Sequence, residues 1–303
     1  MSAVDLTGRV AVVTGAGRGL GNAYAVALAA AGAGVVVNDV DEESARRTAD
    51  EITSAGGRAA VVVAPVGPAE TADRLVAAAV HEFGRLDAMI ANAGVLRDRV
   101  LWKTSDAEFD VVVETHLRGA FTCGRAAAQH FREAGGGGRI ILIGSPAGQF
   151  GNFGQTAYAA SKAGVVAMAR TWSLELARAG VTVNAVIPTA MTAMTGTMPI
   201  YADHYERLLA GEPLPRVIRQ EHALGTPADV APLVVWLASA ASEGVTGQAI
   251  GLGGDRLTLY AHPSVLATHD SDGGWTAEGI DAYWRSELGA SAQPSGPTFA
   301  PLD

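Results

Sequence analysis

A short apolar run followed by a glycine-rich turn is the feature that most limits how this chain can fold. Residues 9–14 are β-branched and apolar, as in a buried parallel strand. They lead into the turn Gly-Ala-Gly-Arg-Gly-Leu-Gly at residues 15–21, and the Ala-rich residues 22–31 follow as a predicted helix. This order places backbone N–H groups and the positive end of a helix against an anionic ligand such as a pyrophosphate.

The spacing of the glycines decides how specific this signal is. Gly15, Gly19 and Gly21 fit the pattern G-x-x-x-G-x-G, whereas G-x-G-x-x-G does not fit the stretch. An ordinary turn could carry the same glycines, but the strand before it and the helix after it favour dinucleotide binding. The residues of the turn assigned to the cofactor are Gly15, Arg18, Gly19, Leu20 and Gly21.

Strands and helices alternate along most of the chain. Further strands are expected at residues 34–39, 58–66, 84–91, 139–145, 181–187 and 248–252, and helices at 42–55, 71–83, 106–133, 158–178 and 229–241. This alternation predicts an α/β fold with a Rossmann-type doubly wound parallel sheet in three layers. A single catalytic domain is expected over residues 1–255, with a C-terminal extension at 256–303.

The composition excludes several classes of protein. The net charge is −9 with acidic and basic residues interspersed, which argues against a nucleic-acid surface. The single cysteine, Cys123, excludes an internal disulfide, and no apolar run approaches the ~20 residues of a membrane span. The N-terminus lacks the layout of a signal peptide, so a cytoplasmic location is expected. No metal site is predicted.

Tyr158 and Lys162 are the strongest candidates for chemistry. They are four residues apart in a predicted helix and therefore share one face of it. A nearby ammonium group favours the phenolate, which lowers the pKa of the phenol toward the range of a general acid/base. Any helix can carry such a pair by chance, so the rest of the chain has to support this interpretation.

Asp39, at the end of the second strand, bears on the choice of cofactor. A carboxylate there would accept hydrogen bonds from the adenine ribose hydroxyls and would repel a 2′-phosphate, which favours NAD over NADP. Arg18 in the glycine turn is the counter-evidence, because a cation would attract that phosphate.

Two further strands end in small or polar residues. Asn92, Ala93 and Gly94 follow the fourth strand, and Ser145 ends the fifth. The carboxyl ends of parallel strands are where an open α/β sheet approaches its ligand. Ser145 and Tyr158 are joined by a Gly-rich connection, so both can reach one substrate oxygen.

Two stretches interrupt the alternation. Residues 189–224 are apolar and include Met191, Tyr201 and Tyr205, which suits a lid over a lipophilic substrate, although a surface helix pair packed on the core is the alternative. The extension after residue 255 has scattered aromatic residues among acidic and small ones. It is too short for a domain of its own, and we expect it to dock on its own core or on a neighbouring subunit.

These motifs, in this order and on these elements, resemble the short-chain dehydrogenase/reductase family over roughly residues 5–255. They are residues 14–21, Asn92-Ala93-Gly94, Ser145, Tyr158-x-x-x-Lys162 and residues 184–188. The resemblance implies that Tyr158 is the general acid/base, that Lys162 lowers its pKa and holds the nicotinamide ribose, and that Ser145 hydrogen-bonds the substrate oxygen. It also assigns to the cofactor Val66, Asn92, Ala93, Gly94, Tyr158, Lys162, Pro188 and Thr192, with Thr195 as the alternative to Thr192.

A closer likeness lies in residues 36–39, 94–99, 116–119, 151–155 and 231–234. They resemble the (3R)-hydroxyacyl-CoA dehydrogenase unit of peroxisomal type 2 multifunctional enzymes and its bacterial single-domain relatives. The likeness implies a β-hydroxy or β-keto thioester, or a steroid alcohol, as substrate, and a place in lipid metabolism. His116 stands where most family members carry an active-site Asn, and the hydroxyacyl-CoA branch also has His there, so His116 is counted as catalytic.

The sequence therefore predicts an NAD-dependent oxidoreductase that interconverts a secondary alcohol and a ketone on a lipophilic or acyl-thioester substrate. An NADPH-dependent ketone or 3-oxoacyl reductase is the alternative among enzymes, and a nucleotide-sensing protein without turnover is the alternative from another class. The resemblance also implies a homo-oligomer, a dimer or a homotetramer, formed through the helix near residues 109–131 and the helix after Tyr158.

Overall fold

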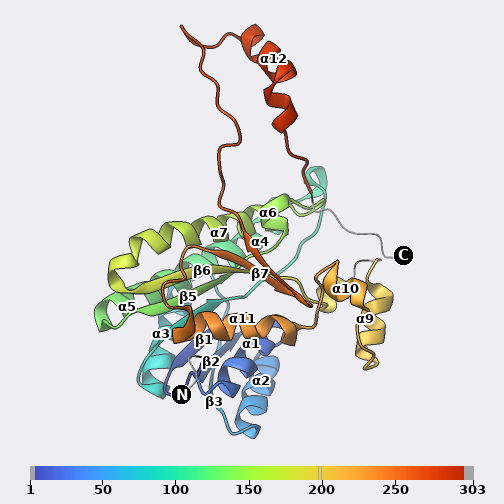
Figure 1. The fold of residues 1–303 in the computed structure, drawn as a ribbon. Coiled ribbons are helices and arrows are strands. Elements are labelled where there is room, and N and C mark those ends of the chain that lie inside the picture. The colour runs from blue at the N-terminus through green and yellow to red at the C-terminus, as the bar shows by residue number, and fades with distance from the viewer. Residues whose placement is uncertain (1–3, 197, 199, 297–303) are drawn as a thin grey trace.

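The computed structural model describes residues 4–196, 198 and 200–296, which form an α/β fold around one sheet (Figure 1). The sheet has eight strands in the order β3-β2-β1-β4-β5-β6-β7-β8. They are β1 (Val10–Thr14), β2 (Gly34–Asp39), β3 (Arg58–Val63), β4 (Ala88–Ala91), β5 (Gly138–Ile143), β6 (Val181–Pro188), β7 (Ala249–Gly253) and β8 (Arg256–Tyr260). The first seven run parallel and β8 pairs antiparallel with β7. The predicted doubly wound sheet is confirmed.

Helices cover both faces of this sheet. The α-helices of the described residues are α1 (Gly19–Ala30), α2 (Glu42–Ser54), α3 (Ala69–Phe83), α4 (Asp106–Val113), α5 (Gly119–Ala134), α6 (Ala147–Phe150), α7 (Thr156–Glu175), α8 (Ala193–Gly196), α9 (Ala202–Leu209), α10 (Arg216–Gln220), α11 (Pro227–Ala238) and α12 (Ala277–Ser286). α1, α2 and α11 pack on one face, and α3, α5 and α7 on the other. None of the described helices is both long and apolar enough to cross a membrane.

The alternation of side chains along β1 explains the three layers. Ala11 and Val13 point into the cluster beneath α1 and α11, whereas Val10 and Val12 point into the cluster beneath α3 and α5. All four are almost fully buried, because a parallel sheet with helices on both faces leaves neither side to water. The core therefore lies on both sides of the central strands.

The strand order reverses between β1 and β4, and this point positions the site. β2 and β3 continue on one side of β1, and β5 to β7 continue on the other side of β4. In open α/β sheets a crevice for ligands opens beyond the carboxyl ends of the strands at such a reversal. Thr14, Ala91 and Ile143 end three of these strands at that edge.

The ends of most elements differ by a few residues from the sequence-based expectation, and β4 begins at Ala88 rather than at residue 84. Three further differences concern the glycine turn, the long helix and the edge of the sheet. α1 begins at Gly19 rather than at residue 22, because the Asn22 N–H already donates to the Arg18 carbonyl, at 3.3 Å. The single helix expected over residues 106–133 is divided into α4 and α5 by a π-helical turn, η2 (Glu114–Arg118). The sheet does not end at residue 252, since β8 follows after a tight turn at Gly254, where φ is +52°.

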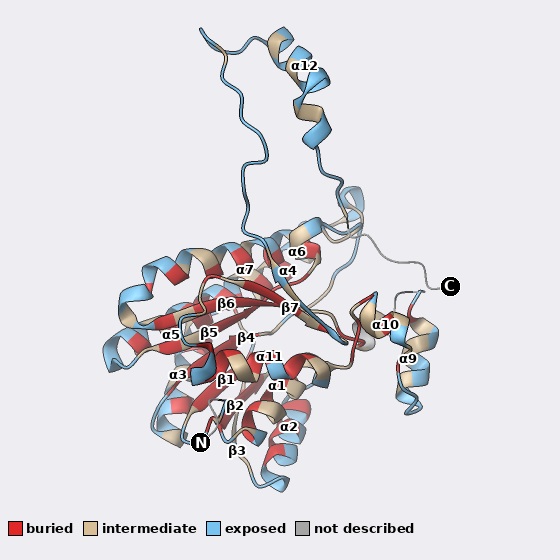
Figure 2. Cartoon of the chain, in the orientation of Figure 1, coloured by how far each residue is buried: buried red, intermediate tan, exposed pale blue. Residues whose placement is uncertain are grey.

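Beyond β8 the chain leaves the body. Residues 261–276 rise away from the sheet, α12 lies at the far end, and the chain returns toward α6 (Figure 1). Figure 2 shows this excursion almost entirely as exposed surface. The predicted docking on the chain's own core is wrong for most of it, and docking on a neighbouring subunit stays a prediction. Residues 297–303 of the predicted extension lie outside the described residues.

Candidate active site

α7 and the end of β5 bring three predicted site residues together. Tyr158 and Lys162 lie one turn apart on α7, and the Lys162 ammonium is 5.7 Å from the centre of the Tyr158 ring. Ser145 follows β5 in the sequence and hydrogen-bonds the Tyr158 phenol. The Ser145 oxygen also accepts the N–H of Ala147, at 3.2 Å, which fixes the start of α6 beside it. Two oxygens thus converge where one substrate oxygen can bind both.

Lys162 is a buried ammonium group. Its Nζ donates to the carbonyl of Ile143 at 2.6 Å, and the residue is 4% exposed. Burial lowers the pKa of Lys162 to about 7, because the charged form loses its hydration. An ammonium has three donors, so Lys162 keeps two that ribose hydroxyls of a cofactor could accept.

The pKa of Tyr158 is raised in the chain on its own, which is the opposite of the sequence-based expectation. Burial is the main cause, the charge of Asp98 adds to it, and the hydrogen bond with Ser145 opposes it. The lowering expected from Lys162 needs a fully charged ammonium, and burial removes part of that charge near neutral pH. A further positive charge beside the phenol would be needed to bring its pKa toward the range of a general base.

His116 packs against the Tyr158 ring. The two rings are perpendicular, with centroids 5.1 Å apart. His116 lies in the π turn η2, and its Nε2 is 3.0 Å from the N–H and 2.8 Å from the carbonyl of Val95. Burial lowers the pKa of His116 to about 3, and the nearby charge of Lys162 acts in the same direction. The imidazole is therefore neutral at physiological pH, and its Nδ1 is buried without a hydrogen-bond partner among the described residues.

Gly94 leaves the space that this imidazole fills. A Cβ at Gly94 would lie 2.3 Å from Cε1 of His116, so any side chain would displace the ring. The turn after β4 can thus pack against the π turn because residue 94 is a glycine. This explains the predicted Gly94 as a packing residue of the site.

The glycine turn forms a cradle at the start of α1. Gly15 and Gly19 have φ values of +61° and +57°, which favour glycine. A Cβ on Gly15 would lie 2.7 Å from Cα of Ala93, whereas a Cβ on Gly19 would meet open space. α1 has no side-chain cap and no acidic residue in its first turn, so its N–H groups and positive end are available to an anion. These features fit the pyrophosphate of a dinucleotide.

Asn92 and Thr14 tie this cradle to the neighbouring turn. The Asn92 side chain donates to the carbonyls of Thr14 and Gly15, at 2.9 and 3.1 Å. The Thr14 hydroxyl accepts the N–H groups of Asn92 and Ala93, at 3.0 and 3.1 Å. Asn92 therefore acts through the backbone of the glycine turn. Sequence analysis included Thr14 in the 14–21 motif but did not give it a role in the site, although a hydroxyl at the last position of a strand before a glycine turn was the available signal.

Asp39 lies beside the same turn. Its Oδ2 accepts the N–H of Gly17 at 2.9 Å, and its Oδ1 accepts the N–H of Asp41 at 3.1 Å. Each carboxylate oxygen retains a lone pair for a ribose hydroxyl. The Arg18 side chain is exposed on the outer side of the turn. Two backbone hydrogen bonds thus hold the Asp39 carboxylate, whereas the Arg18 side chain is exposed.

The remaining predicted cofactor residues lie around this edge. Val66 is half-buried and would be 2.7 Å from a Cβ on Gly119, at the start of α5. Pro188 ends β6. Thr192 lies at the start of the 189–224 stretch, 3.3 Å from the Thr195 hydroxyl, and Thr195 donates to the carbonyl of Ala190 at 2.7 Å. Thr195 is therefore engaged with the backbone, and Thr192 is the better placed of the two for a ligand.

The 189–224 stretch is a folded unit with a small core of its own. Met191, Tyr201, Leu214, Ile218 and Leu224 form a buried cluster. Its two ends meet in a bridge between Ala190 and Gly225. The stretch contains α8, α9 and α10, which pack together in a segment that follows β6. A role as a lid stays a prediction.

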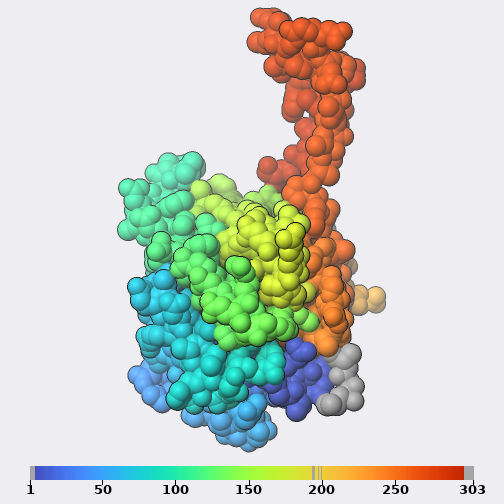
Figure 3. Space-filling view, turned by 90° about the vertical axis from the view of Figure 1, so that its left-hand side faces the viewer, coloured from blue at the N-terminus to red at the C-terminus, as the bar shows by residue number. Residues whose placement is uncertain are grey.

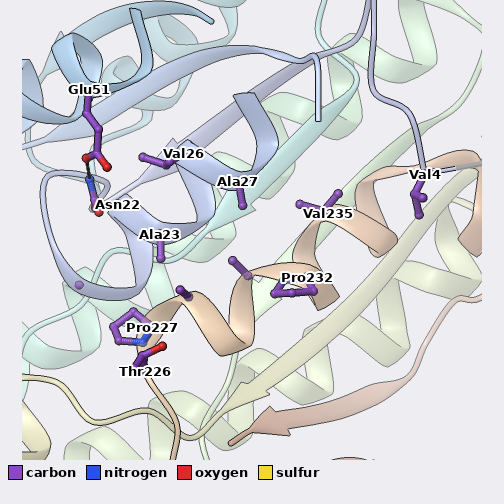
Figure 4. A pocket seen from close by; sticks show the side chains of 13 residues that line it. Val4, Asn22, Ala23, Val26, Ala27, Glu51, Thr226, Pro227, Pro232 and Val235 are labelled. Atoms are coloured by element: carbon purple, nitrogen blue, oxygen red, sulfur yellow. Dashed lines mark hydrogen bonds between the residues drawn. The ribbon is translucent and has the colours of Figure 1, made fainter. Parts of the chain in front are cut away.

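An apolar groove of ≈ 770 Å³ lies elsewhere, between α1 and α11 (Figure 4). Ala23, Val26 and Ala27 line it from α1, and Pro232 and Val235 from α11. None of Ser145, Tyr158, Lys162 and His116 borders it. The groove is therefore separate from the chemistry.

The sheet, the glycine cradle and the Ser-Tyr-Lys group define an oxidoreductase that acts on CH–OH groups with a nicotinamide dinucleotide. Residues 9–201 match the short chain dehydrogenase family, and the chain belongs to it. Hydroxyacyl-CoA dehydrogenase ChsB1 of Mycobacterium tuberculosis is 40% identical over 284 residues, which cover 90% of this chain and 86% of that protein. A (2S)-[(R)-hydroxy(phenyl)methyl]succinyl-CoA dehydrogenase subunit, BbsD of Thauera aromatica, is 38% identical over 84% of this chain and 98% of its own length.

The fold is also shared with solved structures. The crystal structure of a short chain dehydrogenase from Mycobacterium avium has a TM-score of 0.83 and 36% identity, and the match covers 98% of this chain and 100% of that one. The predicted family and enzyme class are thus confirmed. The roles of the individual site residues stay predictions.

Proposed function

We propose that this protein is an NAD-dependent dehydrogenase for a secondary alcohol in a lipophilic or acyl-thioester substrate, and that it also reduces the corresponding ketone. The observation that supports this most directly is the convergence of Ser145, Tyr158 and Lys162 beside the glycine cradle. A hydroxyl, a phenol and a buried ammonium group in this arrangement supply what alcohol oxidation needs from the protein.

Each side chain has its own role in the oxidation. Tyr158 takes the proton of the substrate hydroxyl, while Ser145 donates a hydrogen bond to the same oxygen as it becomes a carbonyl. When bound, the oxidised nicotinamide accepts the hydride from the carbinol carbon. Lys162 holds the ribose of the cofactor and, when charged, favours the Tyr158 phenolate. In the reduction Tyr158 returns the proton.

The preference for NAD rests on Asp39. Its carboxylate lies at the end of β2 and is held by two backbone N–H groups, so it cannot easily turn away from a 2′-phosphate. Arg18 supports the alternative, an NADPH-dependent 3-oxoacyl or ketone reductase. Competition between NAD and NADP in an equilibrium titration distinguishes the two. NADP binding at least as tightly as NAD contradicts our assignment.

The substrate class rests on the relatives and on the 189–224 stretch. ChsB1 and BbsD are named as dehydrogenases of CoA thioesters. The stretch adds apolar side chains after β6 at the ligand edge, which suits an acyl or steroid group. A panel of a 3-hydroxyacyl-CoA, a hydroxysteroid and a simple cyclic alcohol, followed by the absorbance of NADH, tests this assignment.

The variant Tyr158→Phe tests the mechanism. Removal of the hydroxyl eliminates the acid/base, and we expect turnover to fall by about 10²–10⁴-fold. NAD affinity should stay nearly unchanged, because the ring and its contact with His116 remain. Full activity in this variant would overturn the mechanism. No turnover of any alcohol by the unmodified protein, with NAD still bound, would instead support a nucleotide-sensing protein.

We also propose that the protein is a homo-oligomer. The homotetramer expected from the sequence is one such assembly. α4, η2 and α7 leave an apolar surface beside Leu117, Phe121 and Met168. Figure 3 shows the face of the molecule that α5 (green) and α7 (yellow) build together. The cytoplasmic location stays a prediction.

A further inference from the structure

Residues 261–296, called the arm from here on, stand clear of the body in two perpendicular views (Figures 1 and 3). The arm is ordered by its own contacts: His269 and Tyr283 stack with ring centroids 4.4 Å apart, and Trp275 packs beside both. Among the described residues, the recorded hydrogen bonds between residues 263 and 295 stay within the arm. The arm is thus folded but unsupported.

The arm exposes apolar side chains that a folded segment normally buries. Val265 is 80% exposed, and Leu266, Ile280 and Trp284 are exposed as well. The chain as a whole exposes 15366 Å². A compact monomer of 31.0 kDa exposes about 12,000 Å². The excess is larger than the ~1,600 Å² of a standard protein interface, so there is ample surface for a partner to cover.

The comparisons show that the arm is an addition to a body that occurs without it. BbsD is matched over 98% of its length by 84% of this chain, which leaves no room in it for an arm of this size. The solved chain from Mycobacterium avium is matched over 98% of this chain and therefore includes a counterpart of the arm. The body of the fold does not require the arm, so the arm has another role.

The body carries a surface of complementary character at the mouth of the active site. We call it the rim; it consists of residues 97–103 and 150–155. Its two segments are joined by the N–H of Arg99, which donates to Gly154 at 2.7 Å, and by Gln155, which donates to Asp98 at 2.9 Å. Trp102 is 77% exposed and Phe153 is 85% exposed. Tyr158 follows three residues after this rim, on α7.

The charges of the two surfaces are opposite. The described arm carries five acidic residues, Asp270, Asp272, Glu278, Asp281 and Glu287, and one arginine, Arg285, which pairs with Asp281. Residues 97–103 carry Arg97, Arg99 and Lys103 against one acid, Asp98; Arg99 pairs with Glu108 at 2.7 Å, which leaves Arg97 and Lys103 as the cations without an ion pair among the described residues. Complementary charges of this kind guide association and set its orientation.

We propose that the arm of one copy of this chain packs across the rim of a second copy and forms part of the wall of that copy's active site. The arm is anchored at both ends on its own α6, where Tyr260 packs against Phe150 and the Gly296 N–H donates to the Phe150 carbonyl at 2.8 Å. It therefore contacts its own rim only at Phe150 and projects outward, while Trp102 and Phe153 of that rim stay exposed. Residues 261–271 carry neither helix nor strand and can span up to about 36 Å, enough to reach a neighbour.

A second copy is the partner because each chain offers both surfaces. An exchange related by a two-fold axis covers two arms and two rims at once. The exposed Leu257 and Leu259 of the edge strand β8 lie directly before the arm, so the same contact also shields the open edge of the sheet.

Disulfide formation between two co-expressed full-length variants tests this proposal. One chain carries Ile280→Cys on the arm, and the other carries Trp102→Cys on the rim together with a tag that changes its mass. The native Cys123 is buried and does not compete. We expect a mixed covalent dimer under mild oxidation. The matched control pairs Ile280→Cys with Val40→Cys, an exposed position at the end of β2 that lies outside the rim.

A mixed dimer no more abundant than in the control pair overturns the proposal. A link that forms only when both cysteines are in one chain overturns it too, because it shows that the arm folds back on its own rim. Circular dichroism confirms that each variant is folded. The role of the arm in the active-site wall rests on the proposed function, but cross-linking needs no turnover. Failure of the dehydrogenase assay and failure of the cross-link are therefore distinguishable.

Discussion

His116 combines burial, neutrality and contact with the reacting phenol in one side chain. The Val95 backbone lies within hydrogen-bond distance of Nε2 on one side of the ring. On the other side the ring fills the space that Gly94 leaves because it has no side chain. Because burial holds the pKa of His116 at about 3, the folded protein keeps the imidazole neutral where an unfolded chain would protonate it below about 6.5. The residue therefore links stability to pH.

The sign of this linkage gives a prediction. Between pH 6.5 and 3 the unfolded chain binds a proton at His116 that the folded chain does not, so the free energy of unfolding falls as the pH falls through this window. The contribution of His116 is complete above pH 6.5. In His116→Asn we expect the free energy of unfolding to fall less over this window, by on the order of 4 kcal/mol at pH 3. Urea unfolding of both proteins at several pH values measures the difference. Parallel curves for both proteins would contradict this explanation.

At the scale of secondary-structure elements, Arg219 links three segments of the chain through its two ion pairs. It lies on α10, the last helix of the 189–224 stretch, and binds Asp229 of α11 at 3.1 Å and Asp255 of the β7–β8 turn at 2.7 Å. Asp255 also donates its N–H to the Arg219 carbonyl at 3.1 Å. The side chain is only 28% exposed, so this clamp is partly shielded from water.

We expect Arg219→Met to destabilise the packing of α10, the last helix of the 189–224 stretch. We expect a loss of about 1–3 kcal/mol of stability, since two carboxylates remain close together without their cation. We also expect faster proteolysis within residues 189–224 and a higher KM for the lipophilic substrate. Arg216→Met on the same helix is the matched control, because the exposed Arg216 side chain bonds only Gln220 among the described residues. Equal behaviour of the two variants would show that the clamp has no role.

These elements also show what the sequence could predict. Tyr158, Lys162 and Ser145 could be placed because helical spacing and the edge of a parallel sheet bring them together in any fold of this kind. The π turn at His116 could not be predicted, because its residues also suit an ordinary α-helix. What distinguishes it is the fit of His116 to Gly94, which is distant in the sequence. The direction of the Tyr158 pKa shift depends on burial, which a sequence pattern does not give.

β8 was missed for a related reason. β8 offers only five residues of strand pattern after a glycine turn, and the pairing with β7 provides the rest of the stability. Likewise, the separation of the clamp partners Arg219 and Asp255 along the chain leaves no local signal. Sequence analysis is informative where neighbours in the sequence make the contact, and weak where distant segments do.

At the scale of the whole molecule, Phe121 offers a test of the oligomer. It is 41% exposed on α5, with the Arg125 guanidinium 5.1 Å from its ring centre and Trp172 of α7 beside it. Burial of such a side chain at the centre of an interface contributes about 2 kcal/mol or more to association, whereas a carboxylate there would be left without water or a partner.

We therefore expect Phe121→Asp to dissociate the oligomer into smaller species in sedimentation velocity runs, with the fold intact by circular dichroism. Val80→Asp is the control, since Val80 is equally exposed, at 40%, but lies on α3. Identical sedimentation of the two variants would show that the α5–α7 face is not an interface of the oligomer. If Phe121→Asp leaves dimers rather than monomers, the arm contact remains in them, and cross-linking of Ile280→Cys to Trp102→Cys in that background should persist. The two contacts would then be independent, and together they build a tetramer from one chain.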